Sequence, residues 1–157
     1  MKRIIIIFSI VSIALFILFQ GTRNLDTSLS YSDLIVNRIL AFLFNDPQLV
    51  SPDYFKWYPT MNYLVRKLAH FTEYAVFSSL FCWYFSKKKI KASDLFVYSL
   101  LPTLIIAILD EYLQKFIGRG SLVSDVMIDG WGGVTGISFC LLLMSLKRKL
   151  KLKKKFQ

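Results

Sequence analysis

The chain has 157 residues, enough for a single domain, and 55% of them are hydrophobic, with a mean hydropathy of +0.49. A chain this short has too little interior to bury so much apolar surface, so the composition favours lipid as its solvent and argues against a water-soluble domain. The net charge of +10 is confined mainly to the ends of apolar segments, which removes the need for a nucleic-acid partner.

Apolar segments predict an all-α membrane bundle that forms one domain over residues 1–157. Four transmembrane helices are expected at about 4–20, 63–85, 95–116 and 124–146. Each segment is close to the ~20 residues that cross a bilayer as a helix. The first segment resembles a signal peptide, but no small-residue cleavage site follows it, so we interpret it as an uncleaved span.

Basic residues predict the orientation of the bundle. If the N-terminus is cytoplasmic, the cytoplasmic segments hold 13 of the 20 Lys and Arg residues but only one of the ten acidic residues. This asymmetry follows the positive-inside rule, and the basic tail at 147–157 is its largest contributor. The sequence therefore predicts a multi-pass membrane protein with both termini in the cytoplasm.

The segment between the first two spans is then external. Apolar and polar residues alternate over residues 31–44 with a spacing typical of an amphipathic helix that lies at the outer interface. Residues 52–59 are aromatic and carry a proline at each end. This stretch suits either an interfacial aromatic belt or a loop packed over the mouth of the bundle.

Ionisable residues inside the spans all fall in the outer half of this topology. Such residues are costly in lipid unless they are paired or hydrated, and they mark functional sites by default. The candidate polar site comprises Arg66, Lys67, His70, Glu73, Asp110, Glu111, Gln114, Arg119, Asp125 and Asp129. No catalytic role is assigned to any of them from the sequence.

Helical periodicity predicts which of these side chains share a face. Arg66, His70 and Glu73 lie within an arc of ~60° on the second span. On the fourth span, Gly132 and Gly136 share a stripe with the acidic residues, and glycines four residues apart let another helix approach closely. The acidic residues of that span are therefore expected to face the bundle.

This mixed set of charges has several interpretations. Acidic groups beside cations suit a zwitterionic or phosphate-bearing headgroup, and they suit equally a closed salt-bridge network that only holds the bundle together. His70 alone could be a hydrogen-bonded core histidine, Lys67 and its neighbour Arg66 could extend to the outer headgroups, and Asp125 could interact with a helix dipole.

Metal and cofactor chemistry has no recognisable signature. The acidic residues and His70 could bind a divalent metal, but their spacings match no standard site, and His-x-x-Glu reverses the order of the di-iron bundle motif. Cys82 and Cys140 lie apart in apolar stretches and are expected to be reduced, packed thiols. The sequence thus predicts no resident metal or cofactor.

Three segments carry a family resemblance: Arg-Lys-Leu-Ala-His-Phe-Thr-Glu-Tyr at 66–74, Asp-Glu-Tyr-Leu-Gln at 110–114, and Asp-Val-Met-Ile-Asp at 125–129. With Gly118 and Arg119, they resemble the VanZ-like family of bacterial membrane proteins over nearly the whole chain up to the basic tail. The family pattern more often has Asn where this chain has Asp129.

The resemblance implies a protein of the bacterial cell envelope with a polar site at the outer leaflet. The founding member is associated with low-level resistance to the glycopeptide teicoplanin, so the resemblance implies a contribution to such resistance. Membrane lipids are the expected partners, together with a lipophilic glycopeptide or a lipid headgroup. Two alternatives to this function remain. The first is an intramembrane enzyme that acts on a lipid or lipid-linked substrate, and the second is a transporter.

Overall fold

A computed structural model describes residues 2–23, 25–88, 90–118 and 123–155, and these residues form five α-helices and no strand. The helices are α1 (Lys2–Gly21), α2 (Leu25–Phe44), α3 (Pro52–Phe85), α4 (Ala92–Phe116) and α5 (Val123–Lys155). The all-α prediction is therefore confirmed.

Three of these helices are long and apolar enough to cross a membrane: α1 over Arg3–Gly21, α4 over Ala92–Phe116 and α5 over Val123–Lys151. They correspond to the first, third and fourth predicted spans. The second predicted span lies in α3, which does not reach the same hydropathy because polar residues interrupt its apolar sequence. A fourth span thus stays a prediction.

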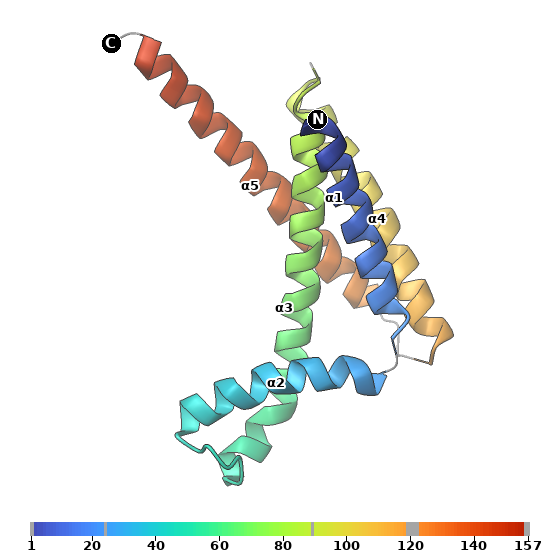
Figure 1. The fold of residues 1–157 in the computed structure, drawn as a ribbon, viewed down its shortest axis with the longest axis vertical. Coiled ribbons are helices and arrows are strands. Elements are labelled where there is room, and N and C mark those ends of the chain that lie inside the picture. Colours follow the sequence, from blue (N-terminus) through green and yellow to red (C-terminus); the bar gives the residue numbers. More distant parts are fainter. Residues whose placement is uncertain (1, 24, 89, 119–122, 156–157) are drawn as a thin grey trace.

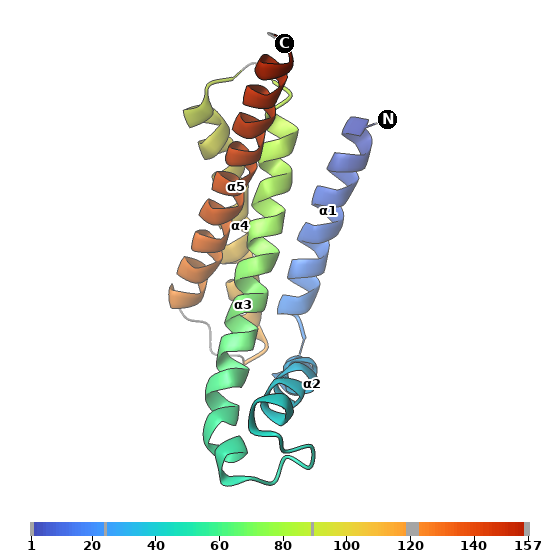
Figure 2. The same cartoon turned by 90° about the vertical axis from the view of Figure 1, so that its left-hand side faces the viewer.

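Helix α3 is the central element of the bundle and packs against each of the other four helices. The start of α1 and the end of α5 lie at the same end of the bundle, and α2 lies crosswise at the opposite end (Figures 1 and 2). Helices α4 and α5 also pack against each other, and α1 packs against α4. This arrangement surrounds the polar part of α3 with other helices.

The first turns of α3 differ from one sequence-based expectation. Residues 52–59 are helical, so the alternative of a loop over the bundle mouth is wrong. Ser51 caps the helix, because its hydroxyl oxygen accepts a hydrogen bond from the backbone N–H of Tyr54 at 3.2 Å, and Pro52 begins the first turn, where no partner for its missing N–H is needed. These local signals start the helix well before the apolar segment.

Helix α2 includes the predicted helix at 31–44 and is held to α3 by polar side chains. Asn62 donates to Asp33 at 2.7 Å and accepts from the hydroxyl of Ser32 at 3.2 Å. Tyr58 also donates to Asp33, and Tyr54 donates to Asn37 at 2.9 Å. Whether α2 lies at the outer interface is not decided by these contacts and stays a prediction.

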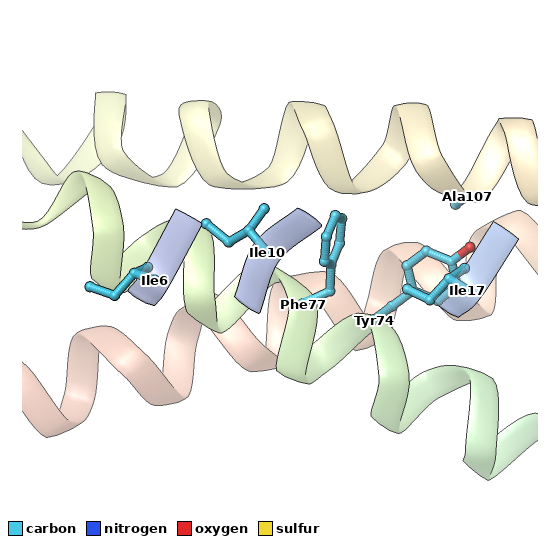
Figure 3. Packing of buried hydrophobic residues seen from close by; sticks show 6 residues of the cluster. All are labelled: Ile6, Ile10, Ile17, Tyr74, Phe77 and Ala107. Carbon is cyan, nitrogen blue, oxygen red and sulfur yellow. The ribbon is translucent and has the colours of Figure 1, made fainter. Parts of the chain in front are cut away.

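Apolar side chains from three helices form the core near the centre of the bundle. The largest cluster contains Ile6, Ile10, Ile17, Tyr74, Phe77 and Ala107, as Figure 3 shows. A second cluster contains Cys82, Leu95 and Ile137, and both cysteines of the chain are free thiols. In lipid such contacts stabilise through close packing more than through exclusion of water.

Glycines set the spacing between α3 and α5. A methyl group at Gly132 would collide with the backbone carbonyl of Phe71, and one at Gly136 would collide with that of Ala75. The hydroxyl of Ser78 donates to the carbonyl of Gly133 at 2.8 Å. The two backbones therefore approach as closely as two helices can, as small residues allow inside membranes.

Candidate functional site

The candidate site residues lie on α3, α4 and α5 at the end of the bundle that carries α2. The chain order explains this position, because α3 runs away from that end, α4 returns to it and α5 starts from it (Figure 1). Of the ten predicted residues, Arg119 lies outside the described residues. The remaining nine fall into an ion pair, a buried cluster of three and four residues placed around them.

The ion pair joins α3 to α5. Lys67 Nζ lies 2.5 Å from Asp125 Oδ1, and the two side chains are 20% and 16% exposed. A pair at this depth is stronger than a surface pair, because solvent screens it less. It also means that Lys67 is occupied by Asp125, and not available to the deeper acids as a contact partner.

The buried cluster consists of His70, Asp110 and Asp129, one residue from each of α3, α4 and α5. One ligand atom from each residue lies within 4.8 Å of the other two, and His70 Nδ1 is 3.8 Å from Asp129 Oδ1. Both carboxylates are 1% exposed, whereas His70 is half-buried. Three ionisable groups thus converge inside a predominantly apolar bundle.

Two neighbours hold the Asp110 carboxylate in place. Gln114, one turn later on α4, donates from Nε2 to Asp110 Oδ2 at 2.9 Å. Gly21, at the end of α1, lies directly against the same carboxylate, and a methyl group there would collide with Asp110 Oδ1. The end of α1 therefore covers the cluster, and a side chain at position 21 would displace the Asp110 carboxylate.

Tyr74 belongs to this site, although the sequence did not single it out as a candidate. Its side chain is fully buried, and its hydroxyl interacts electrostatically with the carboxyl groups of Asp110, Asp129, Glu73 and Glu111. Figure 3 shows the ring between α1 and α4, near Ile17 and Ala107. The sequence signal was present, since Tyr74 follows His70 by four residues and so lies on the same helix face.

Three predicted residues take different positions. Glu111 is buried beside Asp110, and it interacts electrostatically with Asp129. Glu73 points toward α1 and lines a pocket with Ile13, while remaining close enough to Asp110 for the two carboxyl groups to repel each other. Arg66 is half-buried and forms no ion pair or hydrogen bond with the described residues.

The expected arc of Arg66, His70 and Glu73 is consequently divided among different neighbours. Helical periodicity places side chains on a face to within a broad arc, but the neighbouring helices divide that face. Lys67 and His70 meet α5, whereas Glu73 meets α1.

A groove of about 700 Å³ runs between α3 and α5 from this site toward the opposite end of the bundle. Phe71 and Thr72 line it beside His70, and Lys87 and Lys147 line its far end. Its walls are predominantly apolar, with contributions from Leu80, Trp83, Phe139 and Leu143. The groove thus runs along α3 and α5 from Phe71, which follows His70 in the chain, to the two cations Lys87 and Lys147.

This arrangement supports two kinds of chemistry. The carboxylates and the imidazole can hold a cation or transfer protons, and the Lys67–Asp125 pair can exchange with a charged headgroup at the mouth of the site. The groove is suited to an alkyl chain, because its lining is apolar and lies along the membrane-crossing direction of α5.

Comparison with known proteins agrees with the resemblance read from the sequence. A family model described as VanZ/LLP1 matches residues 5–144, which include every described site residue. No curated protein and no solved structure matches the chain.

Proposed function

Since the chain belongs to the VanZ/LLP1 family, we propose that it is a bacterial plasma-membrane protein whose polar site binds the headgroup of an amphiphilic ligand at the outer leaflet. The ligand is teicoplanin or a membrane lipid on which the drug acts, and binding lowers susceptibility to the drug. The groove between α3 and α5 carries this proposal, because it can accommodate an alkyl chain and begins at Phe71, the residue that follows His70 in α3.

The topology that this function needs has four spans with both termini in the cytoplasm. Helix α3 has 34 residues, so it is ~51 Å long and exceeds the ~30 Å hydrocarbon core. Its ionisable residues Arg66, Lys67, His70 and Glu73 are partly buried by the helices packed around it. The basic loop after α3 and the basic end of α5 then lie on the cytoplasmic side.

Single cysteines test this topology. Thr22→Cys and Ser86→Cys, each in a chain that lacks Cys82 and Cys140, are treated in intact cells with a membrane-impermeant thiol reagent. Position 22 should be labelled and position 86 should be labelled only after the cells are opened. The reverse pattern, or labelling of both positions from outside, would exclude the proposed orientation.

Ligand recognition would use both parts of the site. Lys67 and His70 provide cationic or donor groups for phosphate or carboxylate, and the acidic residues bind amines. Teicoplanin combines a polar peptide core with an acyl chain, so the core would lie at the charged cluster and the chain in the groove. Vancomycin lacks the acyl chain, so the groove would give it no added affinity.

Drug susceptibility tests the proposal. Wild type, His70→Ala, Glu111→Ala and Thr135→Trp are expressed at equal membrane levels in a susceptible Gram-positive host. Thr135 is an exposed α5 residue that lines the groove, so a tryptophan there fills the groove without altering the charged cluster. Leu142→Trp, at an exposed α5 position outside the groove, is the matched control.

The wild type and Leu142→Trp should raise resistance to teicoplanin selectively over vancomycin, and the other three variants should lose that rise. Equal resistance in wild type and all variants would show that neither the polar site nor the groove acts on the drug. No rise in any strain would refute the resistance function.

The alternative is an intramembrane enzyme acting on a lipid or lipid-linked substrate. It is favoured by the juxtaposition of a half-buried imidazole with buried carboxylates, the groups that general acid–base catalysis uses. Purified protein in nanodiscs of bacterial lipids would then convert a lipid at a rate that His70→Ala abolishes. Unchanged lipids after prolonged incubation would count against catalysis.

A further inference from the structure

We propose that His70, Asp110 and Asp129 form a binding site for one divalent transition-metal cation between α3, α4 and α5. The inference concerns the same end of the bundle as the proposed function, but it rests only on the geometry of these side chains. The drug-susceptibility result therefore does not decide it.

The distances between the ligand atoms of these three residues suit atoms that bind the same ion better than atoms that form hydrogen bonds with each other. His70 Nδ1 and Asp129 Oδ1 are 3.8 Å apart, too far for a hydrogen bond. Two ligands of one tetrahedral zinc, each at ~2.0–2.1 Å, lie ~3.4 Å apart. The three ligand atoms all lie within 4.8 Å of one another, so side-chain adjustments of about 1 Å complete the coordination.

Asp129 and one further polar group, the Tyr74 hydroxyl, are buried without a hydrogen-bond partner among the described residues. Neither carboxylate oxygen of Asp129 accepts a hydrogen bond from the described residues, although the side chain is 1% exposed. The Tyr74 hydroxyl likewise has no hydrogen-bond partner among the described residues, is fully buried, and interacts electrostatically with Asp110 and Asp129. Buried polar groups of this kind almost always have a partner, and a cation would provide one for both.

Charge balance also favours a cation. Asp110 and Asp129 interact electrostatically with each other inside the bundle, where two buried carboxylates are costly without compensation. Lys67 contributes some positive potential at Asp129, but its ammonium group contacts Asp125. One divalent ion would balance the charges of Asp110 and Asp129, and it would also lie near the buried carboxyl group of Glu111.

The surroundings resemble the supporting shell of a metal centre. The hydrogen bond from Gln114 to Asp110 Oδ2 fixes the orientation of that carboxylate, as outer-shell partners of metal ligands do. Gly21 closes the site from the side of α1. His70, the half-buried member, gives the ion a path from the surface.

The ligand types indicate the class of metal. Magnesium and calcium prefer oxygen ligands alone, whereas one imidazole nitrogen with carboxylates suits zinc, manganese or iron(II). Metal-binding sequence motifs place several ligands close together along the chain, and these three residues do not. Each of the three helices contributes one ligand, so the site cannot be recognised from the spacing of residues along the chain.

Metal titration of the purified protein tests the inference. His70 is the only histidine in the chain, so the full-length protein is purified in detergent with a tag that contains no histidine and is stripped with a chelator. Isothermal titration with Zn²⁺ and Mn²⁺, and visible absorption with Co²⁺, then report stoichiometry and ligand type. Mg²⁺ serves as the comparison ion.

We expect one Zn²⁺ or Co²⁺ per chain. His70→Gln and Asp129→Asn should each weaken binding at least ~10-fold, because losing even an outer-shell partner costs that much. Asp94→Asn, an acidic residue in the first turn of α4 at the other end of the bundle, should bind as wild type does. Zinc should also raise the unfolding temperature of wild type but not of Asp129→Asn.

A separate measurement distinguishes a variant that fails to fold from one that folds but does not bind the metal. Size-exclusion elution of each variant establishes that it is folded, and Asp129→Asn is isosteric, so it decides the question if His70→Gln does not fold. Binding that persists unchanged in Asp129→Asn, or the absence of saturable binding in wild type, would overturn the inference.

Discussion

Helix α3 forms two interfaces of opposite character with its neighbours α5 and α2. Against α5 it uses small residues, so that Gly132 and Gly136 lie directly on backbone carbonyl groups. Against α2 it uses large polar side chains, with Tyr58 and Asn62 bonded to Asp33. The α3–α5 interface combines close backbone contact with hydrogen bonds from serine, whereas the α2–α3 interface combines hydrogen bonds between side chains with the buried apolar residues Val36 and Leu40.

The difference shows how each contact limits motion. Backbones in contact cannot adjust to an added atom, so the α3–α5 interface holds the ligand-bearing faces of both helices at a fixed distance. Helix α2 packs mainly against α3, so we expect it to separate locally from α3 while the rest of the bundle stays folded. The site lies on the rigid interface, and we expect α2 to be the more mobile helix at this end of the bundle.

The largest effect is expected from Gly136→Ala. Its methyl group meets the carbonyl oxygen of Ala75 and the Ser78 hydroxyl, so α3 and α5 must separate. The free energy of unfolding, measured by SDS titration in mixed micelles, should fall by about 3 kcal/mol.

Gly130→Ala is the matched control for that variant. Its methyl group meets only the Leu104 side chain, at 3.3 Å, which can move aside. Alanine is also the better helix former, so the change in the free energy of unfolding should stay within about 1 kcal/mol. Equal stability of the two variants would mean that the α3–α5 contact is not tight.

Asn62→Ala should loosen the α2–α3 interface alone. The change removes the donor to Asp33 and the acceptor for Ser32, at a cost of about 2 kcal/mol. Amide hydrogen exchange should accelerate in α2 and remain unchanged in α4 and α5. Thr60→Ala, at an exposed position two residues earlier, should leave exchange in α2 unchanged; acceleration throughout the bundle would show that α2 does not open independently.

The Lys67–Asp125 pair should contribute a smaller amount. A double-mutant cycle with Lys67→Met and Asp125→Asn compares each single change with the pair. We expect a coupling free energy of about 1 kcal/mol, because both side chains are partly screened by solvent. A coupling near zero would place the pair with ordinary surface ion pairs.

The smallest effect concerns pH. The hydrogen bond to Asp33 raises the pKa of Tyr58 from its usual 10 to about 12. The folded state thus retains this proton more tightly than the unfolded state, so the stabilisation is complete below pH 10 and is lost as the pH rises toward about 12.

Hydrogen exchange in α2 should therefore accelerate over that pH range in wild type. Tyr58→Phe, which carries no ionisable hydroxyl, should lack this additional acceleration relative to its own value at neutral pH. The same pH dependence in both proteins would assign the effect to other groups.

The local sequence pattern was sufficient to predict helices whose formation depends on their own residues. The apolar segments at 4–20, 95–116 and 124–146 coincide with α1, α4 and part of α5, because a run of apolar residues of that length forms a helix whatever surrounds it. At 52–59 the prolines and aromatic residues left two alternatives open, and the loop was wrong, because Ser51 and Pro52 start α3 there.

The site was predictable as a set of residues but not as a set of contacts. Buried acids such as Asp110 and Asp129 stand out because charge is rare inside apolar segments. Periodicity could not tell that Glu73 faces α1 while His70 faces α5. Tyr74 was passed over because an aromatic residue in an apolar helix normally only packs.

The sequence by itself determined that this chain is helical, which segments are apolar enough for a membrane, and how its basic residues are distributed. These properties depend only on the order of residues along the chain. Only the tertiary structure decided which side chains meet. The convergence of His70, Asp110 and Asp129 depends on how three helices are rotated and shifted against one another. That rotation is set by contacts such as Gly136 on the Ala75 carbonyl, which exist only once the helices are packed.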